Sequence, residues 1–64
     1  MKSSDFWERM ELALGVGYAR SWAADFHIPL LGGRTVEQAL SEGDDTQEVW
    51  RAVHQTLGLH AKFR

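Results

Sequence analysis

The chain has 64 residues, a formal net charge of −2 and no cysteine. This length allows one domain, near the lower limit at which a hydrophobic core alone sustains a fold. A chain without cysteine has neither a disulfide framework nor a thiolate metal site. The balanced charge argues against a domain that grips a nucleic-acid backbone through a basic face.

The N-terminus predicts no targeting segment. The first five residues become acidic at Asp5 and lack the apolar run of a secretory signal. No stretch of the chain approaches the length of a membrane span. We therefore expect a cytoplasmic protein that does not enter a membrane.

The first half predicts two helices separated by a glycine-rich break. Asp5 with Glu8 has the spacing of a capping box, and apolar residues follow at helical spacing, so a helix is expected over about residues 5–14. Residues 15–17, Gly-Val-Gly, predict the break. Tyr18, Trp22 and Phe26 recur every fourth residue and predict a helix over 17–27 whose aromatic stripe faces the core. The small residues Ala19 and Ala23 beside the stripe favour close approach to the first helix.

Residues 28–33 predict a loop that plugs the core. Pro29 disfavours a helical conformation for Ile28, and two leucines then precede Gly32 and Gly33. A single helical turn beginning at Pro29 is an alternative for this segment.

Capping patterns predict two helices in the second half. Thr35 with Gln38 indicates a capping box for a short helix over 36–42, which Gly43 would end in the left-handed conformation. Asp45 with Glu48 repeats the pattern for a helix over 45–57. The remaining tail, 59–64, has no periodicity and is expected to fray.

These elements predict an all-α fold, a small single-domain bundle of three principal helices plus one short helix. The core candidates are the apolar residues on the predicted inner faces: Phe6, Met10, Leu14, Tyr18, Trp22, Phe26, Leu31, Val36, Leu40, Val49, Trp50, Val53 and Leu57.

Two segments of the chain carry a family resemblance. The segment Leu-Gly-Gly-Arg-Thr-Val-Glu-Gln-Ala-Leu at 31–40, followed by Glu-Val-Trp-Arg-Ala-Val at 48–53, resembles a family of short actinobacterial proteins, the domain of unknown function 3046. The resemblance covers nearly the whole chain. It implies a single-domain protein often encoded close to the recombinase RecA and its regulator RecX, but no activity. The chain departs from the family pattern at Phe26-His27 and at His54, where a cysteine is expected, so no role for that cysteine carries over.

A helix-turn-helix is one interpretation of residues 35–53. Ala39, Gly43 and Val49 occupy the small, turn and core positions of that motif, which would place the helix from Asp45 in a major groove. Glu42 and Asp44 stand where apolar residues should anchor the turn, and the proposed reading helix opens with acidic residues. Two ordinary capped helices are the competing interpretation.

Other possible sites have simpler structural interpretations. Gly32-Gly33-Arg34 before a helix could form an anion-binding nest, or the glycines could simply turn the chain while Arg34 makes local contacts. Three scattered histidines do not form a metal site, and capping accounts for the acidic residues around Asp45. The sequence therefore predicts no catalytic, metal-binding or cofactor-binding residue.

We interpret the chain as a non-enzymatic protein-interaction or regulatory module, with a helix-turn-helix-like nucleic-acid-binding protein as the alternative. The gene neighbourhood that the resemblance implies favours a link to DNA recombination or repair. Trp and Arg dominate partner-binding hot spots, so the candidate residues are Trp7, Arg34 and Arg51. Trp7 could instead lie flat over the core. The sequence leaves the protein partner and the oligomeric state open.

Overall fold

Helices account for the fold of residues 1–58, the part of the chain that this computed structural model describes. They are α1 (Ser3–Leu14), α2 (Val16–Asp25), the 3-10 turn η1 (Pro29–Leu31), α3 (Val36–Ser41) and α4 (Thr46–Leu57). Within these residues β-pairing is limited to an isolated bridge between Ile28 and Arg34. The predicted all-α fold is confirmed. The turn η1 corresponds to the single helical turn from Pro29 that the sequence analysis gave as an alternative to a loop.

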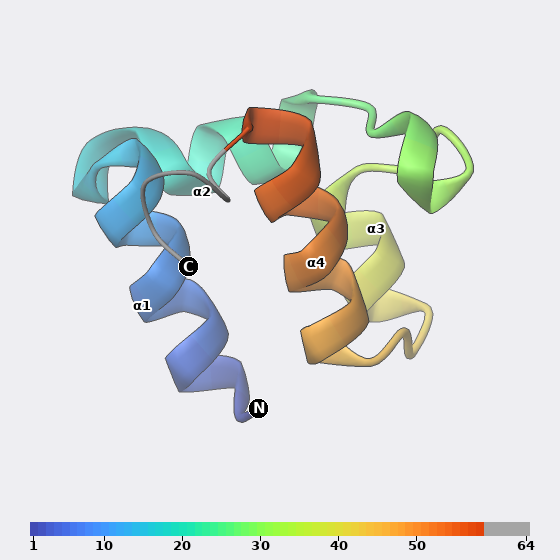
Figure 1. The fold of residues 1–64 in the computed structure, drawn as a ribbon, viewed down its shortest axis with the longest axis horizontal. Helices are drawn as coiled ribbons and strands as arrows, with labels where there is room; N and C mark the ends of the chain where they lie inside the picture. The colour runs from blue at the N-terminus through green and yellow to red at the C-terminus, as the bar shows by residue number, and fades with distance from the viewer. Residues whose placement is uncertain (59–64) are drawn as a thin grey trace.

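The helices surround one core. Helix α2 lies across one end of the molecule, α1 and α4 extend from it on two sides, and α3 lies against α4 (Figure 1). Helix α1 packs on both α2 and α4, while α3 packs on α2 and α4. The loop containing η1 returns the chain from α2 to α3 and also packs on α4.

One glycine joins α1 to α2. The Gly15 N–H donates to the carbonyl of Glu11 (2.7 Å), and the Gly15 carbonyl accepts from the amides of Tyr18 (3.2 Å) and Ala19 (3.0 Å). Gly15 thus closes one helix and opens the next, with φ of 94° and ψ of 147°. The predicted three-residue break is therefore a single residue, and Val16 and Gly17 belong to the first turn of α2.

Two of the three predicted capping boxes are wrong. Helix α1 begins at Ser3, because the Phe6 amide already bonds to the Lys2 carbonyl at 2.9 Å, so Asp5 lies inside its first turn. Asp45 is the N-cap residue of α4, but its side chain makes no capping hydrogen bond. Half of the third box forms: the Thr35 hydroxyl accepts from the backbone amide of Gln38 at 3.1 Å, while the Gln38 side chain donates to Glu42 Oε2 at 3.3 Å instead of bonding back to Thr35.

The predicted ends of two helices also change. Helix α2 ends at Asp25 instead of residue 27, because Phe26 is extended (φ −86°, ψ 125°). Helix α3 ends at Ser41, and Gly43 follows in the left-handed region as predicted. The amides of Gly43 and Asp44 bond back to the carbonyls of Leu40 (3.1 Å) and Ala39 (3.0 Å), so the last turn is closed by a Schellman motif.

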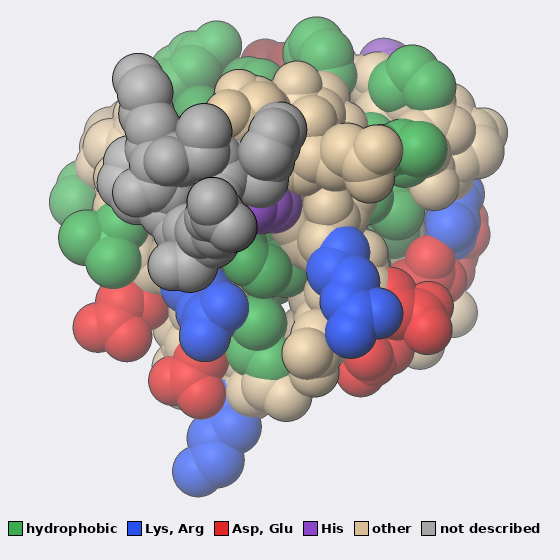
Figure 2. Space-filling view, in the orientation of Figure 1, with side chains coloured by type: hydrophobic (Ala, Val, Ile, Leu, Met, Phe, Trp, Pro, Cys, Tyr) green, Lys and Arg blue, Asp and Glu red, His purple; other side chains and the backbone are tan. Residues whose placement is uncertain are grey.

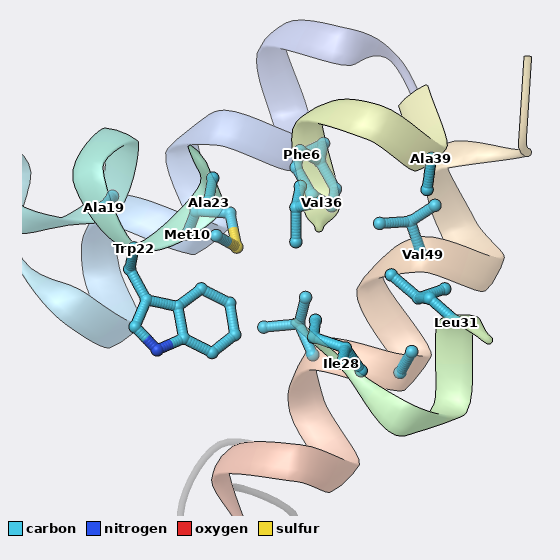
Figure 3. Packing of buried hydrophobic residues seen from close by; sticks show 12 residues of the cluster. Phe6, Met10, Ala19, Trp22, Ala23, Ile28, Leu31, Val36, Ala39 and Val49 are labelled. Atoms are coloured by element: carbon cyan, nitrogen blue, oxygen red, sulfur yellow. The ribbon is translucent and has the colours of Figure 1, made fainter. Parts of the chain in front are cut away.

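The core gathers apolar side chains from every described helix and from η1 (Figure 3). Seven of the predicted core residues are buried: Phe6, Met10, Trp22, Leu31, Val36, Val49 and Val53. Four others are partly buried and pack against this cluster: Leu14, Leu40, Trp50 and Leu57.

Tyr18 and Phe26 were predicted to be core residues, and this is wrong. Their side chains are 56% and 41% exposed. Helix α2 instead turns Ala19 and Ala23 fully inward beside Trp22, and these small side chains let α2 approach its neighbours closely. The inner face of α2 is therefore turned toward the alanines relative to the prediction, and Tyr18 and Phe26 lie at its solvent-exposed edge. Ile28, which the sequence analysis did not place in the core, is fully buried.

Within the described residues, no helix is long and apolar enough to cross a membrane. The tail 59–64, predicted to fray, lies outside the described residues.

Candidate functional site

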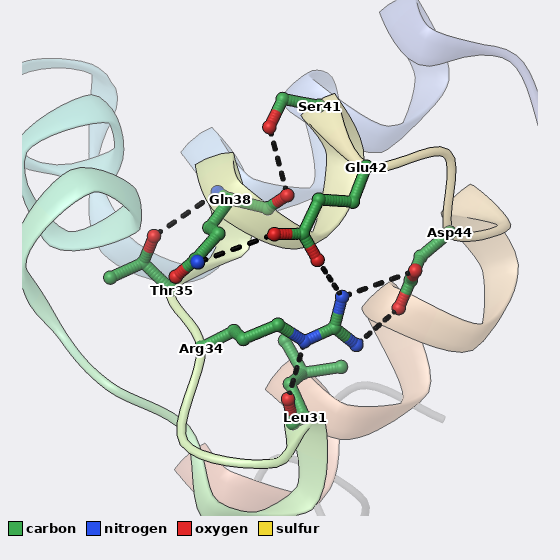
Figure 4. A network of polar contacts seen from close by, with 7 residues as sticks. All are labelled: Leu31, Arg34, Thr35, Gln38, Ser41, Glu42 and Asp44. Atoms are coloured by element: carbon green, nitrogen blue, oxygen red, sulfur yellow. Dashed lines mark hydrogen bonds and ion pairs between the residues drawn. The ribbon is translucent and has the colours of Figure 1, made fainter.

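Arg34 links the loop before α3 to the turn after it (Figure 4). Its Nε donates to the Leu31 carbonyl at 2.8 Å, and Nη1 donates to Glu42 Oε1 at 2.8 Å. Its two terminal nitrogens also bond to Asp44, Nη1 to Oδ1 at 3.3 Å and Nη2 to Oδ2 at 2.6 Å. These contacts occupy the guanidinium within the chain, so they favour a structural role for Arg34.

The electrostatics of this pair follow from the hydrogen bonds. The hydrogen bonds that Arg34 donates to Asp44 hold the pKa of the Asp44 carboxyl below its usual value. Desolvation of the carboxyl has a smaller effect in the opposite direction. The same bonds to Asp44, and then those to Glu42, raise the pKa of the Arg34 guanidinium. Both groups therefore stay charged at neutral pH and fasten the α3–α4 turn to η1.

The lowered pKa of Asp44 predicts a pH-dependent contribution to stability. Since the folded-state pKa lies below the unfolded value of about 3.9, the stabilisation is complete above that pH and disappears as pH falls through the folded pKa. Asp44→Asn should therefore lower the urea midpoint at pH 7, and its difference from the wild type should be smaller near pH 2. The exposed α3 residue Glu37 gives a control, Glu37→Gln. An Asp44→Asn deficit of equal size at both pH values would contradict this account.

The Gly32-Gly33-Arg34 segment is folded as a turn instead of an open nest. The amides of Gly32 and Gly33 donate to the carbonyls of Pro29 and Ile28, both at 3.0 Å, and the Arg34 amide donates to Leu31 at 3.4 Å. An anion would have to displace these bonds. The geometry thus favours the interpretation in which the glycines turn the chain and Arg34 makes local contacts.

Trp7 lies at the edge of the core beneath an arginine. Its ring packs edge-to-face on Phe6, with centroids 5.3 Å apart. The guanidinium carbon of Arg20 stands 3.7 Å from the centroid of the Trp7 ring, a cation–π contact across the α1–α2 turn. Trp7 is partly buried, and a partner could reach this ring face only by displacing Arg20.

Two open hollows flank α1, with volumes of about 500 and 590 Å³. Asp5 and Glu8 line both, and the larger also includes Trp7 and Arg20. Ligand pockets are mostly apolar, with a few convergent polar groups. These hollows have the opposite character, which favours interpreting them as the solvated side of α1.

A smaller apolar hollow of about 160 Å³ lies on α2. We call its lining the aromatic surface, and it comprises Tyr18, Ser21, Trp22, Asp25 and Phe26. The rings of Trp22 and Phe26 are stacked, with centroids 5.0 Å apart and an interplanar angle of 12°. The Trp22 side chain is buried in the core, with 7% of its surface exposed, while Tyr18 and Phe26 are exposed to solvent. The aromatic surface is thus a mainly apolar hollow in which the stacked Trp22 and Phe26 rings lie beside the polar residues Ser21 and Asp25.

Helices α3 and α4 offer little positive charge to a phosphate backbone. In α4 the exposed positions Gln47, Glu48, Arg51 and Gln55 contribute one cation and one anion. Among the described residues on the face seen in Figure 2, basic and acidic side chains lie side by side in the lower half and form no continuous basic patch. The placement of Arg51 therefore gives a helix-turn-helix reading no electrostatic support.

Comparison with known proteins assigns the chain at the family level. The family described as "Protein of unknown function (DUF3046)" matches residues 1–60. The chain belongs to the DUF3046 family. No curated protein and no solved structure matches it.

The aromatic surface of this DUF3046 protein was missed because its residues were assigned to the core. Periodicity shows that Tyr18, Trp22 and Phe26 share a face but not how far that face turns inward. The alanines beside the stripe were the available indication, since Ala19 and Ala23 can pack closely only if they face another helix. No group of three or more His, Cys, Asp or Glu in residues 1–58 is placed to hold a metal ion.

Proposed function

We propose that this DUF3046 protein is a non-enzymatic protein-interaction module that binds its partner through the aromatic surface of α2. The observation that carries the proposal is the exposure of Tyr18 and Phe26, 56% and 41%, on either side of the buried Trp22. A chain of 64 residues has few large apolar side chains to spare from its core. Exposure of two aromatic rings to water is unfavourable for so small a domain, and a partner that covers them would account for it.

The composition and stiffness of the surface suit a protein partner. Tyr, Trp and Phe are enriched at the centres of protein interfaces, where they bury a large area. Stacking on Trp22 holds the Phe26 ring in place, so binding orders little that is not already ordered. Trp7 and Arg34, by contrast, already use much of their contact capacity within the chain.

The non-enzymatic part of the proposal rests on the absence of groups poised for reaction in residues 1–58. The charged side chains of Arg34 and Asp44 pair with each other, and no group of three or more His, Cys, Asp or Glu in these residues is placed to hold a metal ion. The hollow on the aromatic surface, about 160 Å³, is smaller than a typical small-molecule site of roughly 300–1,000 Å³.

The family resemblance suggests which proteins to test first as partners. Because it implies genes close to those of RecA and RecX, a role in DNA recombination or repair is the first to test, with purified RecA and RecX as the first candidate partners.

The test is affinity capture from nuclease-treated native lysate, with a double variant as the decisive bait. We expect Tyr18→Ser/Phe26→Ser to lose the saturable partner of the wild type, because both exposed rings leave the interface. Because Phe26 also stacks on Trp22, we expect the melting temperature of the double variant to fall by several degrees, and circular dichroism of each bait checks that it remains folded. Leu12→Ser is the matched control, since Leu12 is 76% exposed and lines a different hollow.

Three results would contradict the proposal. They are retention of the partner by the double variant, its equal loss with Leu12→Ser, and the absence of any saturable protein partner of the wild type. A salt-sensitive shift of duplex DNA that survives the double variant would support the nucleic-acid alternative instead.

A further inference from the structure

We propose that the aromatic surface receives the guanidinium group of an arginine side chain of the protein partner, with Asp25 as its counter-ion. This inference rests on the proposed function and specifies the chemistry of the partner.

Charge is the first observation that favours a cation. Helix α2 contains two charged residues, Arg20 and Asp25. Arg20 is directed to the ring of Trp7, away from the aromatic surface, whose lining carries only the charge of Asp25. Among the residues that the structure describes, Asp25 forms no ion pair. The aromatic surface is therefore an apolar patch with an uncompensated negative charge at its rim.

The position of Asp25 strengthens this argument. It is the last residue of α2, where the carbonyl ends of the helix dipole already carry partial negative charge, and the last turn contains no basic residue. A carboxylate is unfavourable at this end of a helix. A cation bound beside Asp25 would interact favourably with both the carboxylate and the helix end.

Shape favours a guanidinium over other cations. One face of the Phe26 ring lies against Trp22 in a near-parallel stack, and the side chain is still 41% exposed. A planar guanidinium can stack on such a ring while donating two hydrogen bonds to a carboxylate, which a lysine ammonium cannot do. The volume of the hollow, about 160 Å³, suits the end of one side chain.

The chain already contains one example of this chemistry. Arg20 stands 3.7 Å over the ring of Trp7, and Asp5, Glu8 and Glu11 line the same hollow. An arginine over an aromatic ring, with carboxylates lining the same hollow, thus already occurs beside α1. The aromatic surface offers the same components without the arginine.

The test is an NMR titration of the full chain with three short peptides that differ at one central residue. The peptides are acetyl-Gly-Ala-Arg-Ala-Gly-amide and its citrulline and glutamate analogues. We expect the arginine peptide to shift the ring signals of Tyr18 and Phe26 and to bind about threefold to tenfold more tightly than the citrulline peptide, which keeps the shape but lacks the charge. Equal binding of the arginine and citrulline peptides, or arginine-induced shifts confined to other residues, would overturn the inference.

A second arm tests the counter-ion. Asp25→Asn should weaken binding of the arginine peptide about twofold to fivefold, as expected for an exposed ion pair, and this difference should shrink at high salt. Asp5→Asn, which removes a carboxylate from α1, should leave binding unchanged. Unchanged binding to the Asp25→Asn variant would overturn the assignment of Asp25.

The two proposals fail in different ways. If Tyr18→Ser/Phe26→Ser loses the captured partner while the arginine and citrulline peptides bind the wild type equally, the interaction surface stands and the arginine inference is wrong. If the double variant and Asp25→Asn both keep the partner, both proposals are wrong. If the free protein is a dimer that buries Tyr18 and Phe26, the occupant is a second copy of this chain and the arginine inference is also overturned.

Discussion

Phe6→Ala is expected to lower the urea midpoint of the protein more than any other substitution described above. Phe6 is fully buried and lies between α1 and α4, edge-to-face on Trp50 with ring centroids 6.4 Å apart. Truncating a buried Phe to Ala costs about 3–5 kcal/mol, while a domain of this length is stable by roughly 3–10 kcal/mol in total. The substitution therefore removes much of the free energy of folding, and circular dichroism during urea unfolding would measure it.

The control for this variant lies on the same helix. Leu12 is 76% exposed, so Leu12→Ala should keep the urea midpoint within error of the wild type. If Phe6→Ala unfolded with a midpoint close to that of Leu12→Ala, α1 would not be packed on α4 through Phe6. The described core would then be wrong.

Gly15→Ala is expected to destabilise the protein by about 1–3 kcal/mol for conformational reasons alone. At φ of 94° and ψ of 147°, Gly15 occupies a region that side chains disfavour, and an added Cβ would meet no atom within 4 Å. The cost is therefore backbone strain at the single residue that joins α1 to α2. For a domain of this size, each kcal/mol lowers the melting temperature by about 4–8 °C.

Gly17→Ala is a control that is expected to change the stability in the opposite direction. Gly17 lies two residues further on, inside α2, its φ is not positive, and an added Cβ again meets no atom within 4 Å. Gly17→Ala should stabilise the protein by about 0.5–1 kcal/mol, because Ala is the better helix former. Thermal melts of the two variants would contradict the described connection if both substitutions moved the melting temperature in the same direction.

Local patterns predicted α4 and the α3 cap well. The side chains of Val49 and Val53 are buried at the predicted spacing, and Thr35 caps α3 as its pattern indicated. Both features depend on residues within one or two helical turns. Interactions of this kind are encoded in a short stretch of sequence and need no knowledge of the remaining fold.

The orientation of α2 could not be predicted in the same way. Residues 18, 19, 22, 23 and 26 form a wide apolar face, of which the core covers only one side. Which side is covered depends on how closely α2 approaches α1, and this is a property of the assembled fold. Ile28 is a related case, because its position before Pro29 indicated a loop but not the burial of its side chain.

Contacts between distant residues were also missed. The acidic residues near Asp45 were attributed to capping and the helix dipole, yet Glu42 and Asp44 pair with Arg34, eight and ten residues away. The contact of Arg20 with Trp7 likewise depends on the sharp turn at Gly15. A sequence shows that such charges and rings exist, while the turns that bring them together determine their partners.

The most direct test of the proposed interaction surface is site-specific photo-cross-linking in the native cell. A benzophenone-bearing amino acid would replace Tyr18 or Phe26 in the aromatic surface, and Leu12 in the control. We predict a light-dependent adduct with the same protein from positions 18 and 26, and none with that protein from position 12. An adduct from position 12 alone, or none from 18 and 26, would contradict the assignment of α2 as the binding surface.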